Sequence, residues 1–114
     1  MKIQVTEQNI REGKKGSRSC PIALALNEQL GPNYKFISVG AGSISFLKKK
    51  EEKDGMTFFT NHNIDLPEIA KDFIKIFDEY INVLRLSGDG LLKTVLEVRQ
   101  LIKPFEFEIE LDVL

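Results

Sequence analysis

The sequence has little of the chemistry on which most catalytic and metal-binding sites depend. Among its 114 residues there is one cysteine, Cys20, and one histidine, His62. A single cysteine excludes an intramolecular disulfide and argues against a secreted, disulfide-stapled scaffold. Zinc sites need several Cys or His ligands, so the sequence predicts no metal site and no cofactor.

Net charge and long apolar runs are also lacking. Sixteen Lys and Arg oppose 17 Asp and Glu, which gives a net charge of −1. This balance creates no strong field toward nucleic acid or an anionic membrane, so neither is expected as a partner. The apolar runs fall well short of the roughly 20 residues of a membrane span, and residues 1–7 lack the apolar core of a signal peptide. The sequence therefore predicts a soluble, cytoplasmic protein.

What is present is the composition of an ordinary globular domain. Hydrophobic residues make up 42% of the chain and charged residues 29%, close to the average of folded proteins. The length fits one domain over residues 1–114. The polar and apolar patterning predicts an α+β fold, with a mainly antiparallel sheet of four to five strands and two or three helices in two layers.

The clearest predicted helix covers residues 20–30. Cys20 or the serine before it stands at the N-cap, Pro21 lies in the first turn, and Gly31-Pro32 ends the helix. The segment is apolar nearly all round, so we expect it to be packed deep against a sheet.

The other predicted elements lie on both sides of this helix. A second helix is expected over residues 67–80, because its apolar residues share one face. His62 is expected in a turn between a strand and that helix. The predicted strands cover residues 2–5, 34–39, 43–48, 56–60 and 104–112, with a helical turn at 7–12 and a solvated turn at 48–55.

Residues 81–102 allow two predictions. Leu91, Val95, Val98 and Ile102 recur at intervals of four, three and four residues, which favours a third helix. The richness in Val and Leu leaves a strand open. If helical, the apolar stripe of Leu91, Val95 and Val98 can cover the core or pack on a second copy, so it is a candidate partner-binding surface in a homodimer.

A basic, glycine-containing loop precedes the helix at Cys20. Its residues 13–19 read Gly-Lys-Lys-Gly-Ser-Arg-Ser. Positive charge next to the free N–H groups of a helix N-terminus can bind an anion or phosphate. The candidate anion-binding residues are Lys14, Lys15, Arg18, Ser19 and Cys20. The P-loop pattern is absent, and the alternative is a surface loop with solvated lysines.

Cys20 is also a candidate reactive thiol, because a helix N-terminus and nearby cations lower a thiol pKa. Two observations argue against an enzyme. Leu26 stands six positions later, where cysteine-based phosphatases have Arg. A protease-like pair would need His62 beside Cys20, which nothing in the sequence indicates. The alternative is a small buried residue that caps the helix.

The last predicted strand carries an acidic stripe. Glu106, Glu108, Glu110 and Asp112 follow at two-residue spacing, which places them on one face. The stripe is a candidate surface for a basic partner. The alternative is a solvent-facing stripe whose charges are paired with lysines of a neighbouring strand, such as Lys35 or Lys48.

The stretch Gly13–Leu26, a Gly-Lys-x-Gly loop followed by Cys-Pro-Ile-Ala-Leu-Ala, resembles small uncharacterised proteins encoded by bacteriophages and prophages. Val39-Gly40, the helix after Leu66-Pro67 and residues 103–107 are also similar to that group, whereas residues 79–102 look like an insertion. The resemblance implies no activity. The leading hypothesis is a non-enzymatic phage or prophage accessory protein that binds a macromolecule. The alternative is a binder of a small anionic ligand or nucleotide at residues 13–20.

Overall fold

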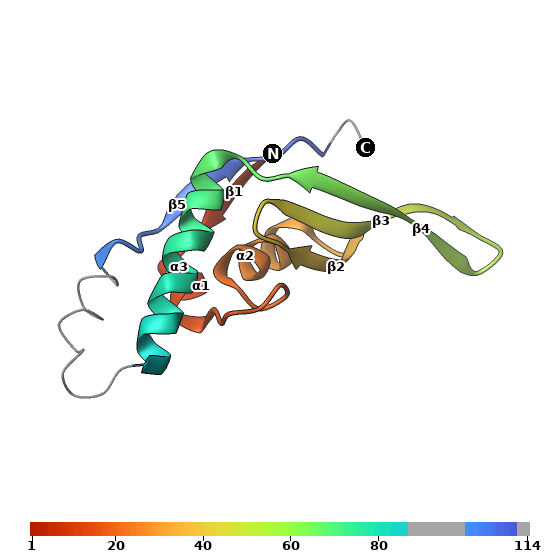
Figure 1. Cartoon of the computed structure of the whole chain (residues 1–114). Helices are drawn as coiled ribbons and strands as arrows, with labels where there is room; N and C mark the ends of the chain where they lie inside the picture. Colours follow the sequence, from red (N-terminus) through yellow and green to blue (C-terminus); the bar gives the residue numbers. More distant parts are fainter. Residues whose placement is uncertain (87–99, 112–114) are drawn as a thin grey trace.

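The computed structural model describes residues 1–86 and 100–111. Over these residues the elements are, in order, β1 (Lys2–Val5), α1 (Glu7–Glu12), α2 (Pro21–Leu30), β2 (Tyr34–Val39), β3 (Ser43–Lys53), β4 (Met56–Asp65), α3 (Glu68–Leu86) and β5 (Phe105–Glu108). The predicted α+β class is confirmed (Figure 1).

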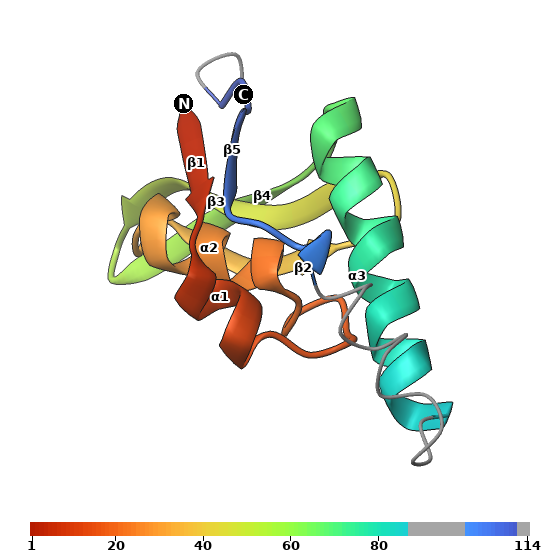
Figure 2. The same ribbon diagram turned by 90° about the vertical axis from the view of Figure 1, so that its left-hand side faces the viewer.

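The five strands form two antiparallel sheets, where the sequence pattern predicted one. β1 pairs with β5, and Ile3 lies opposite Phe107. The other sheet has the strand order β2-β3-β4. Helix α2 packs against both β1 and β2, so it joins the two sheets (Figure 2).

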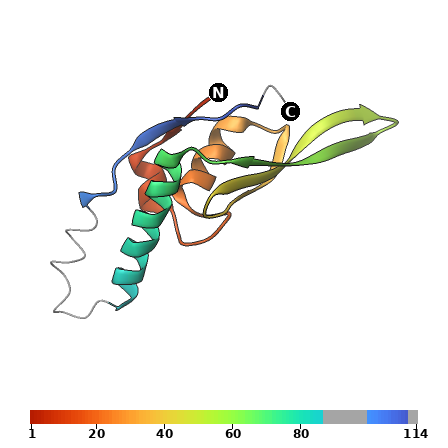
Figure 3. The same cartoon turned by 45° about the horizontal axis from the view of Figure 1, so that its top comes forward.

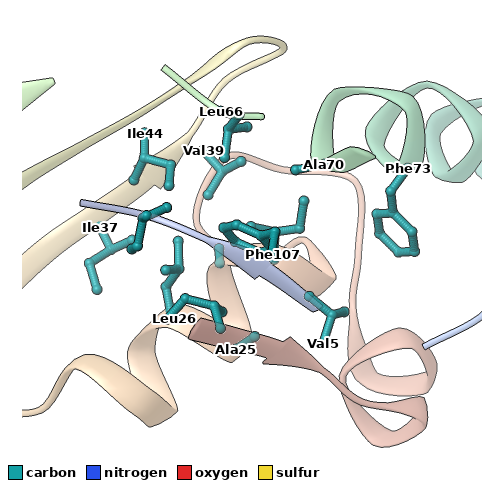
Figure 4. Packing of buried hydrophobic residues seen from close by; sticks show 14 of the residues in the cluster. Val5, Ala25, Leu26, Ile37, Val39, Ile44, Leu66, Ala70, Phe73 and Phe107 are labelled. Carbon is teal, nitrogen blue, oxygen red and sulfur yellow. The ribbon is translucent and has the colours of Figure 1, made fainter. Parts of the chain in front are cut away.

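A single hydrophobic core lies around α2. Ile22, Ala25 and Leu26 are fully buried, which confirms that this helix is packed deep. Side chains of both sheets and of α3 converge on it (Figure 4). Helix α3 closes the core at β5, where the Phe73 and Phe105 rings lie with centroids 4.7 Å apart.

The N-terminal helix α1 is fixed by a polar side chain inside this core. Thr6 caps the helix, and its N–H donates to Asn9 Oδ1 at 2.9 Å in a reciprocal capping box. The fully buried Asn9 also donates from Nδ2 to Glu28 Oε1 at 3.0 Å. Asn9 therefore ties α1 to α2.

The β3–β4 hairpin is longer than predicted. Residues 48–53 belong to β3 rather than to a solvated turn, and the turn itself is Asp54-Gly55, where both φ angles are positive. The strand continues because these charged residues pair across to β4, with Lys53 opposite Met56. The distal half of the hairpin projects from the body as an arm (Figures 1 and 3), and the molecule measures 61 × 24 × 21 Å along its principal axes.

Helix α3 runs on to Leu86, beyond the end at residue 80 that the pattern predicted. The predicted third helix and the stripe of Leu91, Val95 and Val98 lie outside the described residues. Ile102, at the end of that pattern, is buried in the core.

Candidate functional site

The outer edge of β1 is covered by a side chain. The Gln4 N–H donates to Gln29 Oε1 at 2.9 Å, and Gln29 Nε2 donates to the Gln4 carbonyl at 2.7 Å. The amide of Gln29 thus imitates a neighbouring strand. This edge is closed by the chain itself.

The outer edge of β2 is closed by the basic loop. The Val39 N–H donates to the Ser17 carbonyl at 2.7 Å. The strand is also irregular, because its register shifts between Lys35 and Ser38 and Phe36 has a φ of 54°. Bulges and covering loops are two ways in which proteins stop a strand edge from pairing with another chain.

The outer edge of β4 is open. Leu66, just after β4, shows which residues turn their backbone groups toward β3, because its N–H donates to the Gly42 carbonyl at 2.9 Å. Backbone groups alternate in direction along a strand, so those of alternate residues point outward, and they are Thr57, Phe59, Asn61 and Asn63. Across residues 1–86 and 100–111, no hydrogen bond from another element reaches them.

The composition of β4 leaves this edge unguarded. From Met56 to Ile64 the strand contains no Lys, Arg, Asp, Glu or Pro. Natural edge strands usually carry such residues, which keep other chains from pairing with them. A strand edge with nine consecutive uncharged residues is therefore a surface suited to strand addition.

The arm exposes apolar side chains on the face that continues the core. At its base, Ile44 and Phe46 of β3 are buried on this face. Toward the tip none of the other described elements packs there, and Met56 is 60% and Phe58 42% exposed. The apolar residues that alternate along the core-facing side of the hairpin thus continue beyond the point where the core ends.

His62 lies within β4, which corrects its expected place in a turn. Its ring stacks on Phe46 with centroids 5.7 Å apart, and its Nε2 is 2.6 Å from Thr60 Oγ1. The interpretation as a turn residue is wrong because β4 continues to Asp65. The imidazole is held in the sheet and does not line the pocket that contains Cys20.

That pocket, with a volume of about 200 Å³, lies between the basic loop, the β2–β3 turn and α3. Among the predicted anion-binding residues, Lys15 and Cys20 line it, and the carboxylate of Asp78 faces the same space. Lys15 Nζ donates to Asn82 Oδ1 at 3.0 Å. Arg18 instead lies over the Phe36 ring, 5.6 Å from its centroid. The cations of the loop do not converge.

The backbone donors at this helix N-terminus are already used. The Ala23 N–H donates to Cys20 Sγ at 3.5 Å and the Leu24 N–H to the Cys20 carbonyl at 3.0 Å. Within the loop, the Lys14 N–H donates to the Ser19 carbonyl at 2.8 Å. The geometry therefore does not favour the anion-binding alternative, which needs free donors.

Cys20 caps α2, as expected from the alternative in which this residue has a structural role. The residue is partly buried, and desolvation raises the pKa of its thiol above the ordinary value. The hydrogen bonds from Ala23 and Ile22 oppose this rise, while the charge of Asp78 adds to it. A raised pKa disfavours the thiolate, which is the nucleophilic form.

Two residues of the acidic stripe, Glu106 and Glu108, lie on the exposed face of β5, and their charges are paired differently from the expectation. Asp112 lies outside the described residues. Lys2 Nζ lies 3.7 Å from Glu106, and the N-terminal ammonium lies 3.7 Å from Glu108. Glu110 is exposed on the same side. Lys35 and Lys48 lie on the other sheet, so the expected pairing with them is wrong. Lys48 donates to the Leu111 carbonyl at 3.5 Å.

The β4 edge was missed from the sequence. A signal was present, since the nine residues Met-Thr-Phe-Phe-Thr-Asn-His-Asn-Ile follow the charged run at residues 48–54 after a single glycine and contain no charge. The described residues contain no group of three or more His, Cys, Asp or Glu able to hold a metal ion. None of the described helices is long and apolar enough to cross a membrane.

No protein-family model, curated protein or solved structure matches this chain.

Proposed function

We propose that this chain is a non-enzymatic accessory protein, of phage or prophage origin, that works by binding a macromolecule through the β3–β4 arm. The observation that carries the proposal is the arm itself. It extends beyond the core, exposes Met56 and Phe58 on one face and leaves the β4 edge without a partner among the described residues. Exposed apolar groups beside a free strand edge are typical of a protein-binding surface.

A protein suits this surface better than a nucleic acid. The hairpin has four lysines (Lys48, Lys49, Lys50 and Lys53) and four carboxylates (Glu51, Glu52, Asp54 and Asp65). Lys49 Nζ is bound to Glu52 Oε1 at 2.8 Å, and this lysine lowers the pKa of that carboxyl. Because a nucleic-acid surface needs unbalanced positive charge, the arm offers no track for a phosphate backbone.

The state of Cys20 supports a binding role over catalysis. The only cysteine has a thiol whose pKa is raised by burial, and its sulfur accepts a hydrogen bond in a helix cap. The sole histidine is engaged with Thr60 and Phe46 on the arm.

The proposal is tested by affinity capture with the full chain immobilised, followed by binding measurements with the purified partner. The double variant Met56→Ser/Phe58→Ser should weaken binding of that partner by about tenfold or more, as expected for residues at the centre of an interface. Ile69→Ser is the matched control, because it removes an equally exposed apolar side chain from α3. Equal binding by the double variant, or no retained protein from several bacterial hosts, would contradict the proposal.

A further inference from the structure

The open edge of β4 is suited to its own copy. We infer that two chains associate through their β4 strands, antiparallel about a twofold axis, so that two three-stranded sheets become one continuous sheet. The inference rests on the proposed function in one respect, the use of the arm as the binding element. It adds that a second copy of the chain is the first partner of that element.

The charge pattern favours a second copy as the occupant. In an antiparallel pair about a twofold axis, a strand meets its own sequence reversed, so charged residues near its centre would face like charges. β4 has no formally charged side chain from Met56 to Ile64. The charges of the hairpin lie on β3, at the turn and at Asp65. The whole uncharged stretch can therefore pair with itself without like-charge repulsion.

The same stretch defines a register. Its midpoint is Thr60, so pairing centred there places Met56 opposite Ile64 of the second copy and Phe58 opposite His62 of the second copy. The outward backbone groups then meet correctly, because Phe59 and Asn61 lie opposite each other across the axis. Residues that point their N–H and C=O outward thus pair with residues that do the same.

This pairing also completes the exposed face of the arm. The even-numbered residues of both strands lie on the same side of the joined sheet, since a twofold axis perpendicular to the sheet preserves its faces. The exposed Met56 and Phe58 of one copy then adjoin Ile64 and His62 of the other. Each apolar patch is thereby built from two copies, and the dimer presents it twice.

Sedimentation equilibrium of the full chain tests the inference without any other macromolecule. The wild-type chain is expected at twice its monomer mass of 13.0 kDa in the micromolar range. Asn61→Pro removes an outward N–H at the centre of the pair. In the wild type this N–H points away from β3, so its loss should leave the hairpin intact and reduce the mass to that of the monomer. Circular dichroism of this variant verifies that the fold is intact.

A charge exchange at the same position tests the register. Asn61 of one copy is the diagonal neighbour of Asn61 of the other, so Asn61→Lys should weaken the homodimer, and Asn61→Glu should do so as well. A mixture of the two variants should form heterodimers in excess of the statistical half. Gln8→Lys adds the same charge on the exposed side of α1 and should leave the dimer unchanged.

A monomeric wild-type chain at all concentrations overturns the inference, and so does a dimer that Asn61→Pro and Asn61→Lys leave intact. The second result would place the contact elsewhere. If the wild-type chain is monomeric at all concentrations but still captures a partner through Met56 and Phe58, the proposed function stands while the inference fails. If the dimer forms as described but no partner is captured, the proposed function fails while the inference stands.

Discussion

The two halves of the β3–β4 hairpin share one pattern but have different surroundings. Near the body, the alternate residues Ile44 and Phe46 are 1% and 2% exposed. Beyond the body, the alternation continues through Phe58 and Met56, which are 42% and 60% exposed. Strand pairing runs through both halves with one register shift between Lys49 and Glu51, so a loss of pairing in the outer half does not explain the difference. What differs is whether a second layer covers the face.

The edges of the sheets show the same contrast. Gln29 covers β1 and the loop at Ser17 covers β2, whereas β4 has no charged residue before Asp65 and no covering group from the part of the chain that the structure describes. In the body, the edges of β1 and β2 each meet a partner from the same chain, and Ile44 and Phe46 are buried. In the arm, the β4 edge and the exposed side chains of Met56 and Phe58 are available to another chain.

A substitution at the buried base of the hairpin should destabilise the fold far more than one at its exposed tip. Phe46→Ala should lower the free energy of unfolding by about 3–5 kcal/mol, because it removes a fully buried ring and leaves a cavity in the core. Urea denaturation monitored by circular dichroism measures the change. A loss below about 1 kcal/mol would mean that the base of the hairpin is not part of the core.

A glycine of the body tests how tightly the basic loop is held. A Cβ at Gly13 would lie 2.6 Å from the Pro21 ring and 2.8 Å from the Asn9 carbonyl. Gly13→Ala should therefore lower the free energy of unfolding by about 1–3 kcal/mol through overpacking. Gly16→Ala is the matched control, because its Cβ would meet only the movable Ser19 hydroxyl at 2.7 Å. Equal losses in thermal denaturation would contradict this account of the loop.

The closed edge of β1 is expected to contribute less. Gln29→Ala removes both hydrogen bonds to the Gln4 backbone and should cost about 1 kcal/mol of stability, since the groups can bind water instead. Gln29→Glu keeps the acceptor for the Gln4 N–H but sets a carboxylate oxygen against the Gln4 carbonyl, so it should cost at least as much as the alanine variant. If both variants match the wild type in chemical denaturation, the side chain does not act as a substitute strand.

The thiol of Cys20 adds a pH dependence to the body. The folded state holds the thiol proton more tightly than the unfolded chain does, because burial raises its pKa. Stability from this group is therefore complete below the ordinary thiol pKa and is lost as the pH rises through the folded pKa. The wild type should lose more stability than Cys20→Ser between neutral and alkaline pH in denaturant titrations. Parallel curves would show that Cys20 has an ordinary thiol pKa.

The smallest effect is expected on the arm. Phe58→Ser should change the free energy of unfolding of the monomer by no more than about 0.5 kcal/mol, because the ring is already exposed. The measurement is made in the Asn61→Pro background, so that any dimer does not contribute. A loss approaching that of Phe46→Ala would show that the tip packs on the body.

The sequence predicted the elements whose patterns depend on local rules. The cap at Cys20, Pro21 in the first turn and Gly31 after the last turn define α2 without reference to the rest of the fold. The alternation of apolar and acidic residues near the C-terminus likewise predicted that one side of this segment is buried, and Phe107, Ile109 and Leu111 are buried. The α+β class follows from such elements.

Properties that depend on distant contacts could not be predicted. The division into two sheets depends on the pairing of β1 with β5, which lies about 100 residues later in the sequence. The charged run at residues 48–53 reads as a turn because no local rule shows that β4 lies opposite. The open edge of β4 is a lack of partners among the described residues, and it can be recognised only after the neighbours of the other strands are known.

Amide hydrogen exchange at the outward residues of β4 shows most directly whether this edge pairs with another chain. The N–H groups of Phe59, Asn61 and Asn63 should exchange slowly in concentrated wild-type protein and quickly on dilution, while the inward N–H of Leu66 stays slow at both concentrations. Concentration-independent, fast exchange at Phe59, Asn61 and Asn63 would contradict this pairing.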